Sequence, residues 1–394
     1  MKIFADEIVS PRLRGDFIRL RPALLHVENG RVLSLESPSL KSSISRSKSV
    51  IRARLVTPGF VDSHTHLVFA GNRADEWNER LKGVSYQEIA KRGGGIKKTV
   101  AHTRATDSSV LTELALERLR RHQSYGVTTV EVKSGYGLSA LSELKILKIT
   151  KSLKKKSPLS ILSTFMGAHA VPKEYSSEES YVDDLITRIL PAVKGLADFQ
   201  DVFCEKGYFS VRESVRLLNA GKKFGLIPKV HAHEFGRTGG VDVACRVGAV
   251  SADHLMDVND LDLQSMKKSK VVPVVLPGTS FFLGGKVFAP AKKMLKAGLP
   301  VAIASDFNPG TNPTQNFPLC GTFAAVHQGL SLEEVMRGQT LNGALALNLR
   351  DRGSLEKGMR ADFNLWDLET FEEIYYRYGD SRVICSYIGG RKVQ

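Results

Sequence analysis

Hydrophobic positions along the middle of the chain switch between short apolar runs and longer stretches with helical spacing. The short runs, which are typical of buried strands, lie at 127–132, 159–165, 229–233, 249–254, 271–275 and 301–306. Apolar residues recur every three or four positions at 108–125, 141–153 and 211–224, which predicts amphipathic helices. Because repeated strand–helix units build parallel sheets, we expect residues 57–355 to form an α/β fold, a (β/α)8 barrel of the TIM type.

Both ends of the chain show a different pattern, in which short strand-like runs follow one another without intervening helices. These runs lie at 18–20, 23–27, 30–35, 361–366 and 382–388. A turn at Asn29-Gly30 separates two of them. We therefore expect residues 1–56 and 356–394 to combine in a small β-sandwich domain beside the barrel.

Composition is that of a globular protein. The chain has 394 residues, of which 42% are hydrophobic and 25% charged, so it can bury a large core. Nothing approaches the roughly 18 consecutive apolar residues of a membrane span, and the first residues lack the apolar stretch of a signal peptide. We expect a cytoplasmic protein with no membrane partner. The four cysteines are scattered without a C-x-x-C pair, which disfavours a disulfide framework and a thiolate metal site.

Positive charge is in excess, with a formal net charge of +15. Part of it lies in two basic runs, 41–48 and 151–156, and such runs sometimes mark nucleic-acid-binding surfaces. Neither run is interleaved with aromatic residues, so a solvated loop and an exposed helix end explain them better. We therefore expect no nucleic-acid partner, and the basic field would attract a small anionic substrate.

Side chains that can bind a metal or move a proton stand at the ends of the predicted strands. The first strand runs into Thr57-Pro58-Gly59-Phe60-Val61-Asp62-Ser63-His64-Thr65-His66. Because side chains alternate along a strand, His64 and His66 point the same way and form half of a metal site. Later strand ends carry Glu131, Lys133, His169, His231, His233, His254 and Asp306. The carboxyl ends of barrel strands meet at one rim, so these residues predict an active site there.

Several motifs resemble those of the amidohydrolase superfamily. The marks are Pro-Gly-Phe-Val-Asp-Ser-His-Thr-His at 58–66, Ser305-Asp306, and the segment 353–362. Further marks lie at 130–138, 167–169, 251–255, 276–279 and 305–311. These are similar to the branch that opens the ring of 4-imidazolone-5-propanoate to give N-formimidoyl-L-glutamate in histidine degradation. The resemblance spans essentially the whole chain, and several of its marks lie in substrate loops.

The resemblance implies a mononuclear metal site. Its ligands would be His64, His66, His231 and Asp306. Three imidazoles and one carboxylate suit one Zn²⁺ or Fe ion per chain, and the sequence leaves the choice between them open. The second His-x-His offers two candidates, of which His231 is favoured over His233. Lys133 is interpreted as structural or near the substrate, and not as a carboxylated bridge between two metals.

The resemblance also implies substrate and catalytic residues. Arg73 would bind the propionate carboxylate, because a guanidinium can hold a carboxylate through two hydrogen bonds. The substrate-binding set is Arg73, Tyr136, His169, Glu234, Asn308, Gly310 and Thr311. The catalytic set is His254, Glu234 and Asp306. His254 and Glu234 would assist deprotonation of a metal-activated water, with His254 favoured, and Asp306 would also deliver a proton to the leaving nitrogen.

Other functions remain open at this point. Another cyclic amidohydrolase or a nucleobase-type deaminase would use the same barrel and metal core. Arg73 and the 308–311 loop argue against a nucleobase, which has no carboxylate for them to bind. An inactive binding protein is a further alternative, disfavoured by the complete set of ligands and proton-transfer groups. A homodimer is kept as a hypothesis.

Overall fold

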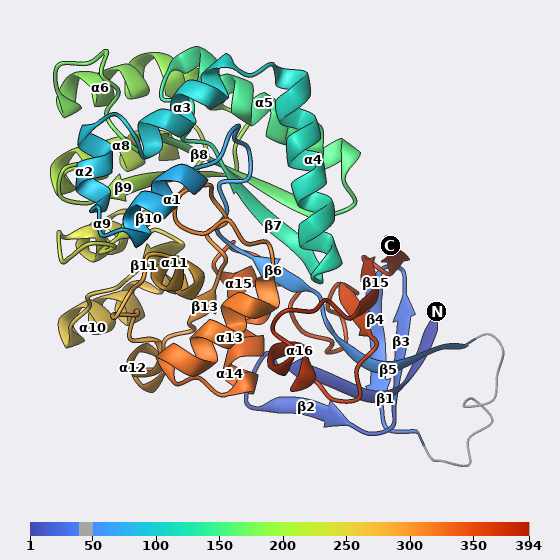
Figure 1. Ribbon diagram of the computed structural model, residues 1–394. Helices are drawn as coiled ribbons and strands as arrows, with labels where there is room; N and C mark the ends of the chain where they lie inside the picture. Colours follow the sequence, from blue (N-terminus) through green and yellow to red (C-terminus); the bar gives the residue numbers. More distant parts are fainter. Residues whose placement is uncertain (39–49, 394) are drawn as a thin grey trace.

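The computed structural model describes residues 1–38 and 50–393, which form a helix-covered parallel sheet and a second, mixed sheet (Figure 1). The parallel sheet contains β6 (Phe60–Asp62), β7 (Val127–Lys133), β8 (Ser160–Ala168), β9 (Phe199–Cys204), β10 (Ile227–Ala232), β11 (Ser251–His254), β12 (Val272–Val275) and β13 (Ala302–Ile303). Its strands are ordered in space as they are in the chain. This arrangement confirms the predicted (β/α)8 barrel.

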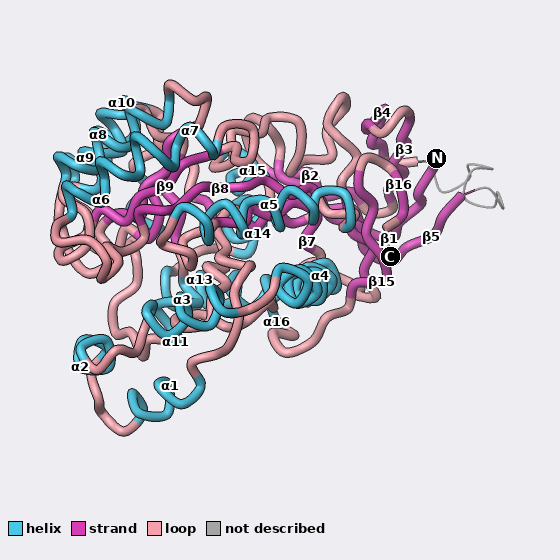
Figure 2. The backbone as a smooth tube through the Cα atoms, turned by 90° about the horizontal axis from the view of Figure 1, so that it is seen from above, coloured by secondary structure: helices cyan, strands magenta, loops and turns pink. Residues whose placement is uncertain are grey.

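Helices surround these strands, as the view in Figure 2 shows. They are α1 (Ala74–Leu81), α2 (Tyr86–Lys91), α3 (Ile96–Ala105), α4 (Ser108–Ser124), α5 (Ala140–Lys156), α6 (Glu178–Asp184), α7 (Leu190–Val193), α8 (Val211–Lys222), α9 (Gly240–Val247), α10 (Asp260–Ser269), α11 (Pro277–Phe282), α12 (Ala291–Lys296), α13 (Phe317–Gln328), α14 (Leu332–Gln339), α15 (Leu341–Leu345) and α16 (Glu373–Tyr376). A π-helical segment, Leu185–Ile189, joins α6 to α7. Among the described helices, none is both long and apolar enough to span a bilayer.

The predicted helices correspond to α4, α5 and α8. Helix α5 ends in Lys154, Lys155 and Lys156, so the basic run 151–156 is the exposed end of a helix, as expected. The other basic run, 41–48, lies outside the described residues. Strand β9 and the helices other than α4, α5 and α8 were not predicted; among them are α1 to α3, which lie between β6 and β7.

The mixed sheet is built from both ends of the chain. Its strands are β1 (Lys2–Pro11), β2 (Phe17–Leu20), β3 (Ala23–Glu28), β4 (Arg31–Glu36), β5 (Val50–Pro58), β14 (Phe363–Trp366), β15 (Val383–Ile388) and β16 (Arg391–Lys392). In the order β16-β15-β14-β5-β1-β3-β4, with β2 on β1, they make one hydrogen-bonded sheet. A separate mixed sheet from both termini is thus confirmed; its strands form one sheet, and it stands at one side of the barrel (Figure 1). Strand β5 leads directly into β6.

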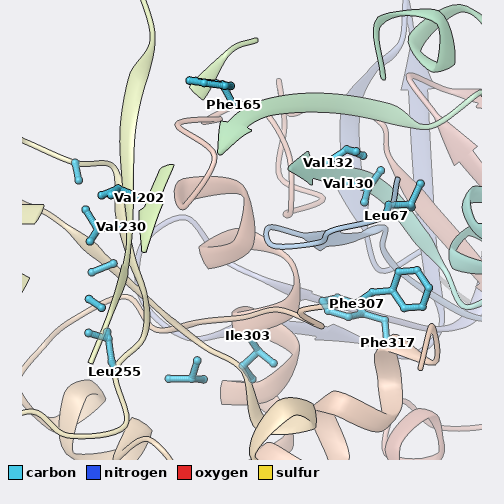
Figure 3. Close-up of a cluster of buried hydrophobic side chains, with 14 of the residues drawn as sticks. Leu67, Val130, Val132, Phe165, Val202, Val230, Leu255, Ile303, Phe307 and Phe317 are labelled. Carbon is cyan, nitrogen blue, oxygen red and sulfur yellow. The ribbon is translucent and has the colours of Figure 1, made fainter. Parts of the chain in front are cut away.

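Along β7, apolar side chains that pack against the helices alternate with polar side chains that face the barrel interior. Val130 and Val132 belong to a large apolar cluster (Figure 3), which also contains buried hydrophobic residues of α4 and α5. Because neighbouring side chains on a strand point to opposite faces, Glu131 and Lys133 face the inside of the barrel. The packing of the helices therefore fixes which polar residues of the strand line the interior.

Backbone hydrogen bonds close the barrel at its carboxyl-terminal rim. The Asp306 N–H donates to the carbonyl of His64 at 2.9 Å, and the His66 N–H donates to the carbonyl of Phe307 at 2.9 Å. The segment after β13 therefore lies directly against the segment after β6. This closure brings the His-x-His motif and Asp306 together, although about 240 residues separate them in the chain.

Candidate active site

The four predicted metal ligands converge at the rim of the barrel. His64 and His66 follow β6, His231 lies on β10 and Asp306 follows β13; all four are buried. The Oδ1 atom of Asp306 lies 3.5 Å from Nε2 of His64 and 3.6 Å from Nε2 of His66. The rings of His64 and His231 are 4.5 Å apart between centroids. Among the described residues, two groups that share His64 could each hold a metal ion: His64, His66 and Asp306, and His64, His231 and His254.

Unpaired nitrogens in this cluster fit a metal ion. Within the described residues, Nε2 of His64 and Nε2 of His231 are buried and make no hydrogen bond. On the other side of each ring, Nδ1 of His64 donates to Oδ2 of Asp253 at 2.6 Å, whereas Nδ1 of His231 lies 3.1 Å from Oδ2 of Asp201 without a hydrogen bond of good geometry. A carboxylate at Nδ1 leaves the Nε2 lone pair for a metal. Three imidazoles and one carboxylate are the donors that zinc and iron accept.

Electrostatics prepares these side chains to bind a cation. Burial lowers the pKa of His64 and of His66 well below the usual imidazole value, so both are neutral near pH 7. Burial raises the pKa of Asp306 to about 6. The hydroxyl of Thr279 donates to Oδ2 of Asp306 at 2.7 Å, which leaves Oδ1 on the side of the histidines.

The backbone is strained where these residues leave their strands. The φ angle is +52° at Asp306, +78° at His254 and +56° at His233. Non-glycine residues rarely adopt these left-handed values, and such strain is concentrated at functional sites.

The two histidines of the second His-x-His have different surroundings. His231 lies beside His64, whereas Nδ1 of His233 donates to the carbonyl of Asp257 at 2.9 Å. His233 is not among the side chains that could share a metal with His64. The geometry supports the interpretation of His231 as the ligand and of His233 as a packing residue.

A cavity opens above the metal-ligand cluster. Its lining residues are His66, Arg73, Ile96, Tyr136, His169, Phe203, Tyr208, His231, Glu234, Phe235, His254, Leu283, Asp306, Asn308 and Thr311. Sequence reasoning missed the aromatic wall made by Phe203, Tyr208 and Phe235, in which the rings of Phe203 and Tyr208 are 4.2 Å apart. Phe203 could have been found from the sequence if residues 199–204 had been predicted as a strand, because Phe203 stands near the carboxyl end of that strand.

Arg73 brings a positive charge to the cavity wall. It stands directly before α1, is buried, and its Nε donates to the hydroxyl of Thr99 at 2.8 Å. A Cβ atom placed on Gly310 would lie 2.1 Å from Nη1 of Arg73. Only a glycine therefore lets the guanidinium pack so closely against the loop after β13.

The side chain of Asn308 holds the loop after Asp306 through four hydrogen bonds. Nδ2 of Asn308 donates to the hydroxyl of Thr311 and to the carbonyl of Asp306, each at 2.7 Å. Its Oδ1 accepts hydrogen bonds from the N–H groups of Gly310 and Thr311, each at 2.8 Å. These backbone donors are thus already engaged within the loop, and Arg73 is the cationic group that the cavity wall presents to a carboxylate.

A second wall carries an imidazole and a phenol. The ring of His169 stacks on that of His66, with 4.9 Å between the centroids, and the centroid of the Tyr136 ring lies 5.5 Å from that of His169. Burial lowers the pKa of His169 to about 3. Its Nδ1 donates to the carbonyl of Gly135 at 3.2 Å, so Nε2 is a hydrogen-bond acceptor. The buried carboxylate of Glu143 holds this loop by accepting several of its backbone N–H groups.

Two groups that can exchange a proton face each other near the metal cluster. Nε2 of His254 lies 3.6 Å from Oε2 of Glu234. Burial, and then the charge of Asp306, raises the pKa of Glu234 well above its usual range. Burial also lowers the pKa of His254 well below its usual value. A carboxyl group with a raised pKa beside a neutral imidazole is suited to general acid–base chemistry.

Comparison with known proteins gives consistent results. The Amidohydrolase family matches residues 73–393. The chain is 40% identical over 380 residues to an imidazolonepropionase of Christiangramia forsetii, covering 95% of this chain and 92% of that protein. It is 44% identical over 346 residues to an imidazolonepropionase of Geobacillus kaustophilus, covering 87% and 81%.

Solved structures agree with the fold. The chain superimposes on 5-methylcytosine deaminase from Klebsiella pneumoniae with a TM-score of 0.76, covering 100% of this chain and 97% of that chain. The sequence identity is 18%, so this likeness shows the barrel and its added sheet but not the reaction.

Proposed function

We propose that this chain, which belongs to the amidohydrolase family and within it to the imidazolonepropionases, hydrolyses 4-imidazolone-5-propanoate to N-formimidoyl-L-glutamate in histidine degradation. The observation that carries this function is the identity of 40% over nearly the whole chain to a protein of that name. The cavity supports it, because metal-ligand candidates at its floor and a guanidinium in its wall suit a cyclic amide that bears a carboxylate.

His64, His66, His231 and Asp306 would hold the metal ion. When bound, a Zn²⁺ or Fe ion lowers the pKa of water and polarises a carbonyl group. Arg73 would bind the propionate carboxylate and so fix the ring over the metal cluster. Tyr136 and the acceptor nitrogen of His169 would hold the planar ring from the side.

Protons are moved by the side chains around the ring. Water adds to the ring carbonyl carbon, and Glu234 and His254 would take the proton that it releases. His254 would also stabilise the negative charge that develops on the carbonyl oxygen. The bond between this carbon and the ring nitrogen then breaks, and Asp306 would deliver a proton to that nitrogen. The proton taken from the water passes from Glu234 and His254 to Asp306 and from there to the leaving nitrogen, so the step balances and the side chains return to their starting states.

The direct test is turnover of freshly prepared 4-imidazolone-5-propanoate, followed as loss of ring absorbance, with cytosine and guanine as competing substrates. We expect turnover of the imidazolone alone. A protein that deaminates a nucleobase and leaves the imidazolone intact would replace this function with the deaminase alternative, on the same fold.

Three further features are proposals of the same kind. We infer a protein that works in the cytoplasm, takes a small anionic substrate without binding nucleic acid, and pairs as a homodimer. Analytical ultracentrifugation tests the dimer, and a gel-shift assay tests nucleic-acid binding.

Replacing Arg73 by methionine is expected to lower kcat/KM about 100-fold, mainly by raising KM. The reason is that charge-assisted hydrogen bonds to a carboxylate contribute about 1.5–3 kcal/mol to binding. Steady-state kinetics measures the effect. Arg92 serves as a control, because it forms an exposed ion pair with Glu79 at 3.1 Å. Arg92→Met should keep the wild-type KM; an unchanged KM in Arg73→Met would remove the carboxylate role of Arg73.

Replacing Gly310 by alanine is expected to raise KM through Arg73. The added Cβ would lie 2.1 Å from Nη1 of Arg73, so the guanidinium must move away from its present place. We expect KM to rise about tenfold, since a displaced group retains part of its interaction. The double variant Arg73→Met/Gly310→Ala should have the KM of Arg73→Met alone. If the two substitutions raise KM additively, Gly310→Ala does not act through Arg73.

A further inference from the structure

A fully buried group of charged side chains lies inside the barrel beneath the metal-ligand cluster. It contains Glu131, Lys133, Asp201, Lys229 and Asp253, whose side chains are all 0% exposed. Barrel interiors are usually filled by branched apolar residues. The mechanism above assigns none of these five side chains a part in the reaction.

Contacts join the five side chains into one network. Nζ of Lys133 lies 2.8 Å from Oε1 of Glu131, 2.7 Å from Oδ2 of Asp201 and 3.9 Å from Oδ2 of Asp253. Nζ of Lys229 lies 3.6 Å from Oε1 of Glu131 and 3.7 Å from Oδ2 of Asp253. The network therefore spans β7, β9, β10 and β11.

The same network contacts the metal-ligand histidines. Oδ2 of Asp201, which binds Lys133, lies 3.1 Å from Nδ1 of His231. Oδ2 of Asp253 accepts the hydrogen bond from Nδ1 of His64 at 2.6 Å. Lys229 also donates to the carbonyl of Ser63, directly before His64, at 3.1 Å. Lys133 is thus connected to His231 through Asp201, and Lys229 is connected to His64 through Asp253.

Stability does not explain why these charges are buried. Removing charges from water is costly, and an apolar set of similar volume is often equally stable or more stable. Although burial alone would lower the pKa of Lys133, Asp201 and then Glu131 raise it above its usual range. Lys133 is therefore a permanent cation, held where two carboxylates need a counter-charge.

We propose that Lys133 and Lys229 are positioning residues of the metal site, which hold Asp201 and Asp253 against His231 and His64 and so fix the orientation of both imidazoles. This inference rests on the metal role of these histidines in the proposed function. An anchored carboxylate keeps the proton on Nδ1 and directs the Nε2 lone pair to the metal. Without its lysine, each carboxylate would lose the cation beside the oxygen that faces the ring and keep only the donor on its other oxygen, the Ser251 hydroxyl for Asp253 and the His231 N–H for Asp201.

The test measures the affinity of metal-free protein for Co²⁺ by competition with a chelator. The wild type is compared with Lys133→Met, Asp201→Asn and the double variant. Loss of a partner of a metal ligand weakens binding about 10–100-fold, so we expect this for Asp201→Asn, and at least about tenfold for Lys133→Met. Because Lys133 acts through Asp201, the double variant should bind Co²⁺ no more weakly than Asp201→Asn.

A lysine elsewhere in the fold provides the matched control. Nζ of Lys145 on α5 donates to the carbonyls of Thr103, Arg104 and Thr106, each at 3.0 Å. Lys145→Met should lower the melting temperature and leave Co²⁺ affinity unchanged. The visible spectrum of bound Co²⁺, which reports coordination geometry, should change in Lys133→Met but not in Lys145→Met.

Two results would overturn the inference. One is a Co²⁺ affinity of Lys133→Met equal to that of the wild type. The other is that Lys133→Met weakens Co²⁺ binding by the same factor in the wild type and in Asp201→Asn. A wild type that binds no Co²⁺ would instead overturn the metal centre of the proposed function. If Lys133→Met does not fold, the same cycle is run with Lys229→Met and Asp253→Asn, whose side chains are 3.7 Å apart.

Discussion

Metal-free protein is expected to lose imidazolone hydrolysis by more than about 1,000-fold, and one equivalent of Zn²⁺ or Fe²⁺ per chain is expected to restore it. A bound metal contributes several kcal/mol to stabilising the charge that develops in this kind of reaction, and each 1.4 kcal/mol is about tenfold in rate. Within the described residues, the buried Nε2 atoms of His64 and His231 have no hydrogen-bond partner, so no protein group replaces the metal ion at these two atoms.

The measurement combines dialysis against a chelator, elemental analysis of the protein and the absorbance assay. Adding back each metal separately shows which ion supports turnover. His231→Asn should lose the metal, whereas His233→Asn should keep about one ion per chain, because His233 binds the carbonyl of Asp257. Asparagine also tolerates the positive φ at position 233. Full activity of protein shown to be metal-free would contradict the mechanism.

Two simple regularities of the fold bring the four candidate metal ligands together. His64 and His66 are two positions apart on an extended segment, so their common direction follows from the alternation of a strand. Parallel strands then bring their carboxyl ends to one rim, which gathers His231 and Asp306 without any knowledge of side-chain packing. The resemblance to a known family adds Arg73 and Tyr136, which periodicity alone does not single out.

Strand β9 shows what the apolar pattern misses. Its six residues, Phe-Gln-Asp-Val-Phe-Cys, are all buried, yet Gln200 and Asp201 interrupt the run of apolar residues that predicts a strand. Asp201 is buried because Lys133 lies against it, 68 positions away in the chain. The hydrogen bond between Asp253 and His64 joins residues 189 positions apart. Pairs at such separations depend on the closed barrel, so a local pattern does not reveal them.

Helices α1 to α3 were missed for a different reason. They are short, and Gly83, Gly93, Gly94 and Gly95 divide the segment between them. Fewer than three turns give little helical periodicity, and glycine lowers helix propensity. Yet this segment carries Thr99, whose hydroxyl fixes Arg73 at the cavity wall. The segment that fixes Arg73 at the cavity wall is thus one with a weak sequence pattern.

Replacing His254 by alanine is expected to lower kcat by about 100- to 10,000-fold while the protein keeps its metal. A positioned acid–base group contributes about this much, and loss of one group that stabilises a developing oxyanion costs about 100- to 1,000-fold. KM should change little, because in the proposed function Arg73, and not His254, would bind the propionate carboxylate. Steady-state kinetics, with elemental analysis of the same preparation, measures both effects.

A second variant separates the part of His254 from that of its neighbour. His254 and Glu234 face each other at 3.6 Å, so a shared proton transfer makes their effects non-additive. We expect His254→Ala/Glu234→Gln to be hardly slower than the slower single variant. Turnover by His254→Ala within a few-fold of the wild type would exclude this histidine from the chemistry. Loss of the metal in His254→Ala would instead make it a ligand, since its ring nitrogen lies close enough to those of His64 and His231 to share an ion with them.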